Sequence, residues 1–188
     1  MTSIEWTDRT WNPVTGCDRI SPGCDNCYAL AMAKRLKAMG QPRYQNDGDP
    51  RTSGPGFGLT VHHEAIDIPL HWRKPSMVFV NSMSDLFHKA VPDLFIAEAF
   101  EIMAEAKQHT FQVLTKRPQR MAADLTDRDF ILGSTDHDDT PWPLPNVWLG
   151  TSIESDRYAF RADHLRAAPA AVRFLSCEPL LGPLPSLD

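Results

Sequence analysis

Hydrophobic and polar positions follow two different periods along the second half of the chain. Short apolar runs rich in β-branched and aromatic residues predict buried strands. These runs cover residues 77–81, 110–115, 147–151 and 171–176. Between them, apolar positions recur at helical spacing and predict helices over 92–107, 119–125 and 156–167. Strands that alternate with helices in this way indicate a parallel sheet covered by helices.

The first half of the chain has fewer regular elements. An apolar stripe predicts a helix over residues 28–39, which Gly40 and Pro42 end. Residues 41–58 form a long polar loop, of a kind that often covers a binding site. Two further strands are predicted near Thr10 and over residues 59–63, and another loop over 133–145. The chain therefore has about six strand-like segments.

Each predicted strand of the second half runs directly into polar residues. These polar ends are Asn81–Asp85, Thr115–Arg117, Thr151–Ser155 and Ser176–Glu178. In a barrel or partial barrel of parallel strands, all carboxyl ends open on one face, where cofactors and substrates bind. Such residues also cap helices, and for any one cluster capping is the competing interpretation.

Composition indicates one globular domain over residues 1–188. Hydrophobic residues make up 42% of the chain and charged residues 23%, as in ordinary globular proteins. The net charge of −5 argues against a protein that coats nucleic acid non-specifically. No secretory leader and no apolar run long enough for a membrane span is present in this sequence. We therefore expect a cytoplasmic protein without a membrane partner, in a compartment where clustered cysteines bind metals more often than they form disulfides.

Three cysteines carry the candidate chemistry. Cys17, Cys24 and Cys27 have the spacing C-x6-C-x2-C, and no fourth cysteine lies nearby. A closed zinc site takes four ligands, whereas an iron–sulfur cluster on three thiolates keeps one iron open for a small molecule. The alternatives are free thiols, or zinc completed by a distant histidine. The candidate histidines are His62, His63 and His88.

Local sequence segments resemble one protein family along essentially the whole chain. The segments are IEWTDRTWNPVTGC, SPGCDNCYA, VFVNSMSDLFH, QVLTKRPQRM, VWLGTSIES and RFLSCEPLLGP. They are similar to a phage-associated family of unknown function that is grouped with the radical S-adenosylmethionine (SAM) enzymes. The resemblance implies an α/β fold, namely a radical-SAM-like partial (βα)6 barrel of parallel strands.

The same resemblance implies cofactors and a reaction. A [4Fe–4S] cluster on the three cysteines would bind SAM and cleave it reductively to start radical chemistry, with electrons from a separate donor. The implied SAM contacts are Asn81, Ser82, Asp85, Lys116 for the carboxylate, and Ser152 and Glu154 for the ribose.

Three features depart from the radical SAM pattern. Its commonest cysteine spacing is C-x3-C-x2-C, and its glycine-rich SAM motif has no obvious equivalent here. Similar proteins also continue with another strand and helix, so we expect that this chain lacks a C-terminal extension.

The substrate stays open at this stage. Basic clusters at 72–74 and 116–120 are compatible with a DNA or RNA substrate, whereas the acidic balance fits a peptide or small molecule equally well. The alternative function is a non-catalytic zinc or iron–sulfur module that binds a protein or nucleic-acid partner. A metal-free α/β binding protein is the third hypothesis. The role of Cys177, the fourth cysteine, is also open.

Overall fold

Five parallel strands form the central sheet of the protein. The structure is a computed structural model and describes residues 4–127, 130 and 140–187. The strands are β1 (Arg9–Trp11), β4 (Met77–Val80), β5 (Thr110–Thr115), β6 (Val147–Ser152) and β7 (Val172–Ser176). Their order across the sheet, β1-β4-β5-β6-β7, is their order along the chain. Right-handed crossovers in such a sheet place the connecting helices on one face.

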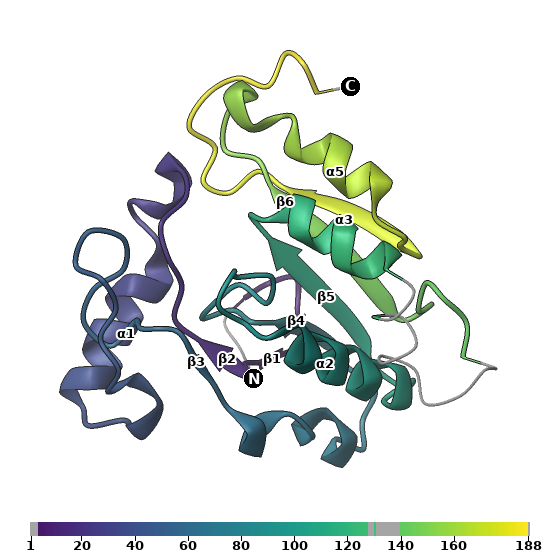
Figure 1. Ribbon diagram of the computed structural model, residues 1–188, viewed down its shortest axis with the longest axis horizontal. Coiled ribbons are helices and arrows are strands. Elements are labelled where there is room, and N and C mark those ends of the chain that lie inside the picture. The colour runs from purple at the N-terminus through teal and green to yellow at the C-terminus, as the bar shows by residue number, and fades with distance from the viewer. Residues whose placement is uncertain (1–3, 128–129, 131–139, 188) are drawn as a thin grey trace.

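Among the described residues, three α-helices cover that face, whereas helix α1 lies apart. The covering helices are α2 (Asp93–Glu105), α3 (Pro118–Thr126) and α5 (Arg161–Ala167), and Figure 1 shows them along the same side of the sheet. Helix α1 (Tyr28–Ala38) lies away from them and packs in a separate small apolar cluster. None of the helices in these described parts of the chain is both long and apolar enough to span a bilayer.

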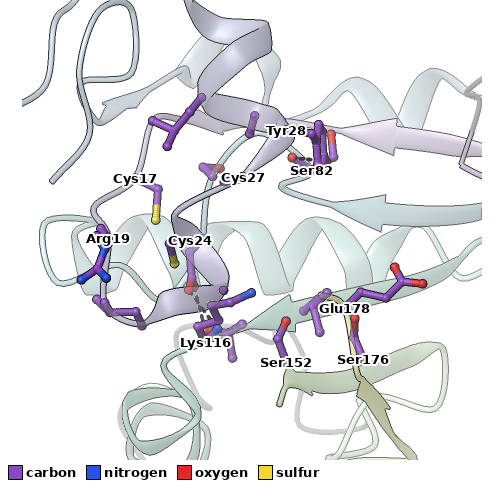
Figure 2. A pocket seen from close by; sticks show the side chains of 18 of the residues that line it. Cys17, Arg19, Cys24, Cys27, Tyr28, Ser82, Lys116, Ser152, Ser176 and Glu178 are labelled. Carbon is purple, nitrogen blue, oxygen red and sulfur yellow. Dashed lines mark hydrogen bonds between the residues drawn. The ribbon is translucent and has the colours of Figure 1, made fainter. Parts of the chain in front are cut away.

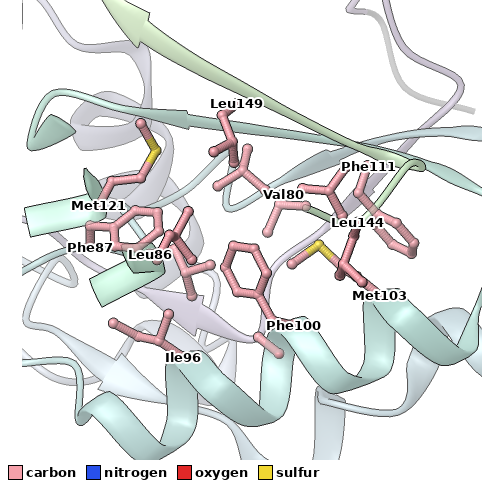
Figure 3. Close-up of a cluster of buried hydrophobic side chains, with 14 of the residues drawn as sticks. Val80, Leu86, Phe87, Ile96, Phe100, Met103, Phe111, Met121, Leu144 and Leu149 are labelled. Carbon is pink, nitrogen blue, oxygen red and sulfur yellow. The ribbon is translucent and has the colours of Figure 1, made fainter. Parts of the chain in front are cut away.

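The main core lies between the sheet and helix α2. Val80, Phe111 and Leu149 point from three neighbouring strands toward Phe100 and Met103 of the helix, as Figure 3 shows. All five side chains are almost completely buried. The strand residues alternate, so that every second side chain enters this core and the intervening ones face the opposite side of the sheet. That opposite face is therefore available for a site.

Most of the predicted elements are confirmed. The helices predicted over 28–39, 92–107 and 119–125 appear with ends within two residues of the prediction. The helix predicted over 156–167 is divided into the 3₁₀ helix η5 (Asp156–Tyr158) and α5. The loop predicted over 133–145 includes residues 131–139, which lie outside the described residues.

The strand predicted over residues 59–63 is not part of the parallel sheet. Its central residues form β3 (Thr60–Val61), which pairs antiparallel with β2 (Val14–Thr15). The amide of His62 also donates to the carbonyl of Pro13 at 2.8 Å, which extends this pairing by one bond. A β-branched run predicts a strand but not its partner, which is why the sequence did not show that this segment pairs antiparallel with β2. The α/β class is confirmed, and the six-fold partial barrel stays a prediction.

Gly16 fixes the path of the chain immediately before the first cysteine. Its φ of +86° is in the left-handed region, and its amide donates to the carbonyl of Met83 at 3.0 Å. A Cβ atom at this position would lie 2.3 Å from the carbonyl oxygen of Gly58. Only glycine permits both the backbone angle and this approach, so Gly16 fixes the backbone position from which Cys17 starts.

Gly16→Ala should destabilise the protein more than Gly40→Ala. Gly40 also has a positive φ, +73°, but a Cβ there meets nothing within 4 Å. Left-handed strain alone costs roughly 1–2 kcal/mol, and Gly16→Ala adds a clash with backbone. Urea unfolding of the two variants measures the difference. Equal losses would show that the approach of Gly58 does not constrain residue 16.

Candidate functional site

A pocket of about 410 Å³ lies at the carboxyl ends of the strands. Its lining includes all three clustered cysteines and residues from the ends of β4, β5, β6 and β7. Those strand-end residues are Asn81, Ser82, Asp85, Thr115, Lys116, Arg117, Ser152, Ser176 and Glu178. In Figure 2 the cysteines lie at one end and Ser152, Ser176 and Glu178 at the other, with Lys116 between them. The predicted gathering of polar strand ends is thus observed.

Apolar side chains from the second face of the sheet complete the pocket. Phe79 and Leu114 alternate with the core positions of β4 and β5 and line the cavity. Trp6 packs on Phe79 with ring centroids 4.7 Å apart. Ligand pockets typically combine such apolar walls with a few polar groups, and their volumes run from about 300 to 1,000 Å³. The pocket therefore has the size and composition of a small-molecule site.

The long loop braces the cysteine segment. The amide of Cys17 donates to the carbonyl of Phe57 at 3.3 Å, and the amide of Arg19 donates to Thr52 at 2.7 Å. The segment then turns through the 3₁₀ helix η1 (Pro22–Cys24), and Cys27 precedes the first residue of α1. Backbone pairing with loop 41–58 thus replaces regular secondary structure in positioning the first thiol.

All four cysteines are free thiols, and three of them share the pocket wall. Cys177 is not among the residues that line it. Within the part of the chain that the structure describes, no three His, Cys, Asp or Glu side chains converge on one point to hold a single ion.

The histidines weighed as distant zinc ligands have other partners. The ring of His88 contacts Asp18 through Nε2 at 3.0 Å and accepts from the amide of Ala90 through Nδ1 at 3.2 Å. His62 Nε2 lies 2.8 Å from the hydroxyl of Thr15. His63 packs against Phe95 with ring centroids 5.1 Å apart. Ligation through either ring nitrogen of His88, or through Nε2 of His62, would break one of these hydrogen bonds.

Cys17 has a strongly perturbed environment. Burial raises the pKa of its thiol to about 12, and the negative charge of Asp85 adds to this shift. The guanidinium of Arg117 acts in the opposite direction, with Nη1 at 3.4 Å from Sγ. Beside it, a hydrogen bond from Thr52 is the main cause that lowers the pKa of Asp18. A thiolate at position 17 therefore depends on nearby positive charge.

Two of the predicted cofactor contacts are carboxylates with partners inside the protein. Asp85 lines the pocket but is paired with Arg117 at 2.8 Å. Glu154 is completely buried and paired with Arg161 at 2.7 Å, and its other oxygen accepts from the amide of Gly23 at 3.4 Å. Glu154 thus lies behind the cysteine loop and is not among the lining residues.

Asn81 is the most informative of the predicted contacts. It is 2% exposed, and neither atom of its side-chain amide has a hydrogen-bond partner. Its φ of +60° makes it the non-glycine residue in the left-handed region among the described residues. A buried amide without hydrogen-bond partners costs about 1–3 kcal/mol. Left-handed backbone strain at a non-glycine residue persists mainly at functional sites. Asn81 therefore has the properties of a ligand-binding residue.

The structure adds pocket residues that the sequence argument did not assign. Arg117 stands beside the first cysteine, and Tyr28, next to the last one, donates from its hydroxyl to the carbonyl of Ser82. Ser176 and Glu178 line the far wall. A sequence signal existed for Arg117, since it follows the end of β5 by two residues and precedes the proline that begins α3. Its burial, which distinguishes it from an exposed basic residue, is seen only in the structure.

Comparison with known proteins places the sequence in a family. Residues 1–188 match DUF5131, which is described as a protein family of unknown function. The chain belongs to the DUF5131 family. No curated protein and no solved structure matches it. Membership of DUF5131 thus covers the entire chain, including the cysteine segment and every strand end, but assigns no activity to them.

Arg161→Met should lower the free energy of unfolding by about 3–5 kcal/mol, because it leaves the buried carboxylate of Glu154 unpaired. Arg166 supplies the control, since its pair with Asp163 is largely exposed. Arg166→Ala should cost no more than about 1 kcal/mol. Chemical denaturation of both variants tests the comparison, and a loss at Arg161 as small as that at Arg166 would contradict it.

Proposed function

We propose that this protein is a radical SAM-type iron–sulfur enzyme, with a [4Fe–4S] cluster on Cys17, Cys24 and Cys27. The observation that carries the proposal is the composition of one pocket. Three cysteines without a fourth line its wall, and a buried amide without partners, that of Asn81, lines it too. Three thiolates leave one coordination position of a cluster open, and the pocket adjoins that position.

The three cysteines would hold a cluster by one thiolate on each of three irons. The apolar walls of Trp6, Phe79 and Leu114 exclude water from the pocket. When bound, the cluster supplies the electron that cleaves SAM and starts radical chemistry on a substrate, and an external one-electron donor replenishes it.

Four of the predicted contacts have no ion-pair partner within the described residues, and of these four the hydroxyl of Ser82 donates to Asn12 at 3.2 Å but can still accept. The amide of Asn81 offers a donor and an acceptor, and the ammonium of Lys116 offers a partner for a carboxylate. The hydroxyls of Ser82 and Ser152 lie on the same lining and suit ribose or amino groups. For Asp85 and Glu154 we propose a positioning role, because arginines occupy their carboxylates.

Anaerobic reconstitution with iron and sulfide tests the proposal. The protein should gain visible absorption and an electron paramagnetic resonance signal that changes when SAM is added. Replacing Cys17, Cys24 or Cys27 by alanine should abolish cluster uptake. Cys177→Ala is the matched control, since it removes a cysteine that does not line the pocket, and it should bind the cluster like the wild type.

Two outcomes would refute the proposal. A cluster whose spectrum is indifferent to SAM, or tightly bound zinc in place of iron, would identify a metal-stabilised module that binds a protein or nucleic-acid partner. Full partner binding and stability after triple replacement of the cysteines would identify a metal-free binding protein. The substrate class, including DNA or RNA, is the next question only if SAM is cleaved.

Asn81→Gly should separate stability from binding. Glycine relieves the left-handed strain and removes two unpartnered polar atoms, so the free energy of unfolding should rise by about 1 kcal/mol. Loss of the amide should weaken SAM binding to the reconstituted protein about tenfold. Asn81→Ala is the matched variant, which also removes the two polar atoms but keeps the left-handed strain, so it should weaken binding equally with a smaller gain in stability. Unchanged affinity in both variants would exclude Asn81 from the ligand site.

A further inference from the structure

The guanidinium of Arg117 connects the first cysteine to the end of the sheet. Its Nη1 lies 2.8 Å from Oδ2 of Asp85 and 3.4 Å from Sγ of Cys17. Its Nη2 donates to the carbonyl of Asp18 at 3.1 Å. The side chains of Arg117 and Asp85 are 14% and 7% exposed, so water screens this contact weakly. One positive and one negative charge are therefore held beside a single sulfur.

The carboxylate of Asp85 is fixed by donors other than the arginine. Its Oδ1 accepts from the hydroxyl of Thr115 at 2.7 Å and from the amide of Phe87 at 3.0 Å. Its Oδ2 accepts from the amide of Lys116 at 3.1 Å. Two of these donors come from the end of β5 and one from the loop that carries Asp85, and their number holds the carboxylate in one orientation. Arg117 is consequently presented to Cys17 in a defined geometry.

We propose that Arg117 and Asp85 together set the reduction potential of the cluster through Cys17. This inference rests on the proposed function. The potential of an iron–sulfur cluster depends on charge and on hydrogen bonds to its sulfurs, and the pair supplies two local charges and one hydrogen bond at this ligand. Reduction adds negative charge, which a neighbouring guanidinium favours and a neighbouring carboxylate opposes.

Replacing one or the other member of the pair should therefore shift the reduction potential of the cluster in opposite directions. Arg117→Gln removes the positive charge and keeps a donor, so the midpoint potential should become more negative. Asp85→Asn removes the negative charge and leaves Arg117 in place, so the potential should become more positive. Each reduction equilibrium should change at least tenfold, equivalent to 59 mV for one electron. General damage to the site does not produce opposite shifts.

The experiment is a mediated redox titration of the reconstituted protein, followed by electron paramagnetic resonance. The control is Arg51→Gln, which removes a positive charge from loop 41–58 at a residue that does not line the pocket. Arg51 pairs with Asp49, and its side chain is 86% exposed, so water screens the charge. The potential of this control should stay at the wild-type value. Cluster content per chain is measured in every variant before its potential is compared.

Each outcome decides between the inference and the proposed function. Opposite shifts in the two variants support the inference. A wild-type cluster that binds SAM, together with unchanged potentials or shifts of one sign, overturns the inference and leaves the proposed function standing. A wild-type protein that takes up no cluster overturns both. If Arg117→Gln fails to fold, Asp85→Asn still decides: a potential more positive than that of the wild type supports the inference, and an unchanged or more negative potential overturns it.

Discussion

A buried carboxylate at the carboxyl ends of the strands stabilises the arrangement of the cysteine pocket. Asp85 needs donors because an isolated buried charge is costly, and the end of β5 and Arg117 supply them. Through Arg117 the same charge reaches Cys17. On the other side of the loop, Glu154 accepts from the amide of Gly23. The parallel sheet thus positions a loop that has little secondary structure of its own.

The regular elements could be predicted because their periodicity is local information. Strand β5 appears with the predicted bounds, Thr110–Thr115, since its core positions alternate with positions on the pocket face. The pairing of segment 59–63 with β2 was not predicted, because the sequence of a strand does not specify which other strand it pairs with. The break at Ala159, which separates η5 from α5, was missed for a similar reason. Its sequence is compatible with a continuous helix.

The site was predictable in location but not in its internal pairing. The cysteines and the polar strand ends were recognised from residue type and position, and they line one pocket. The sequence placed Asp85 and Glu154 there as free ligands, whereas arginines from other segments occupy both carboxylates. Arg117 was read as part of a basic cluster, since burial cannot be seen in a list of residues. Asn81 became decisive only when its backbone angle and missing partners were known.

The pairing of the cysteine segment with loop 41–58 makes the two segments a single cooperative unit. Neither can open alone without breaking the bonds from Cys17 and Arg19 to Phe57 and Thr52. The amide protons of Cys17 and Arg19 are therefore expected to exchange with solvent in the same opening event, at a rate set by this unit and not by global unfolding. A ligand that bridges the three thiols would slow that event and protect both segments together.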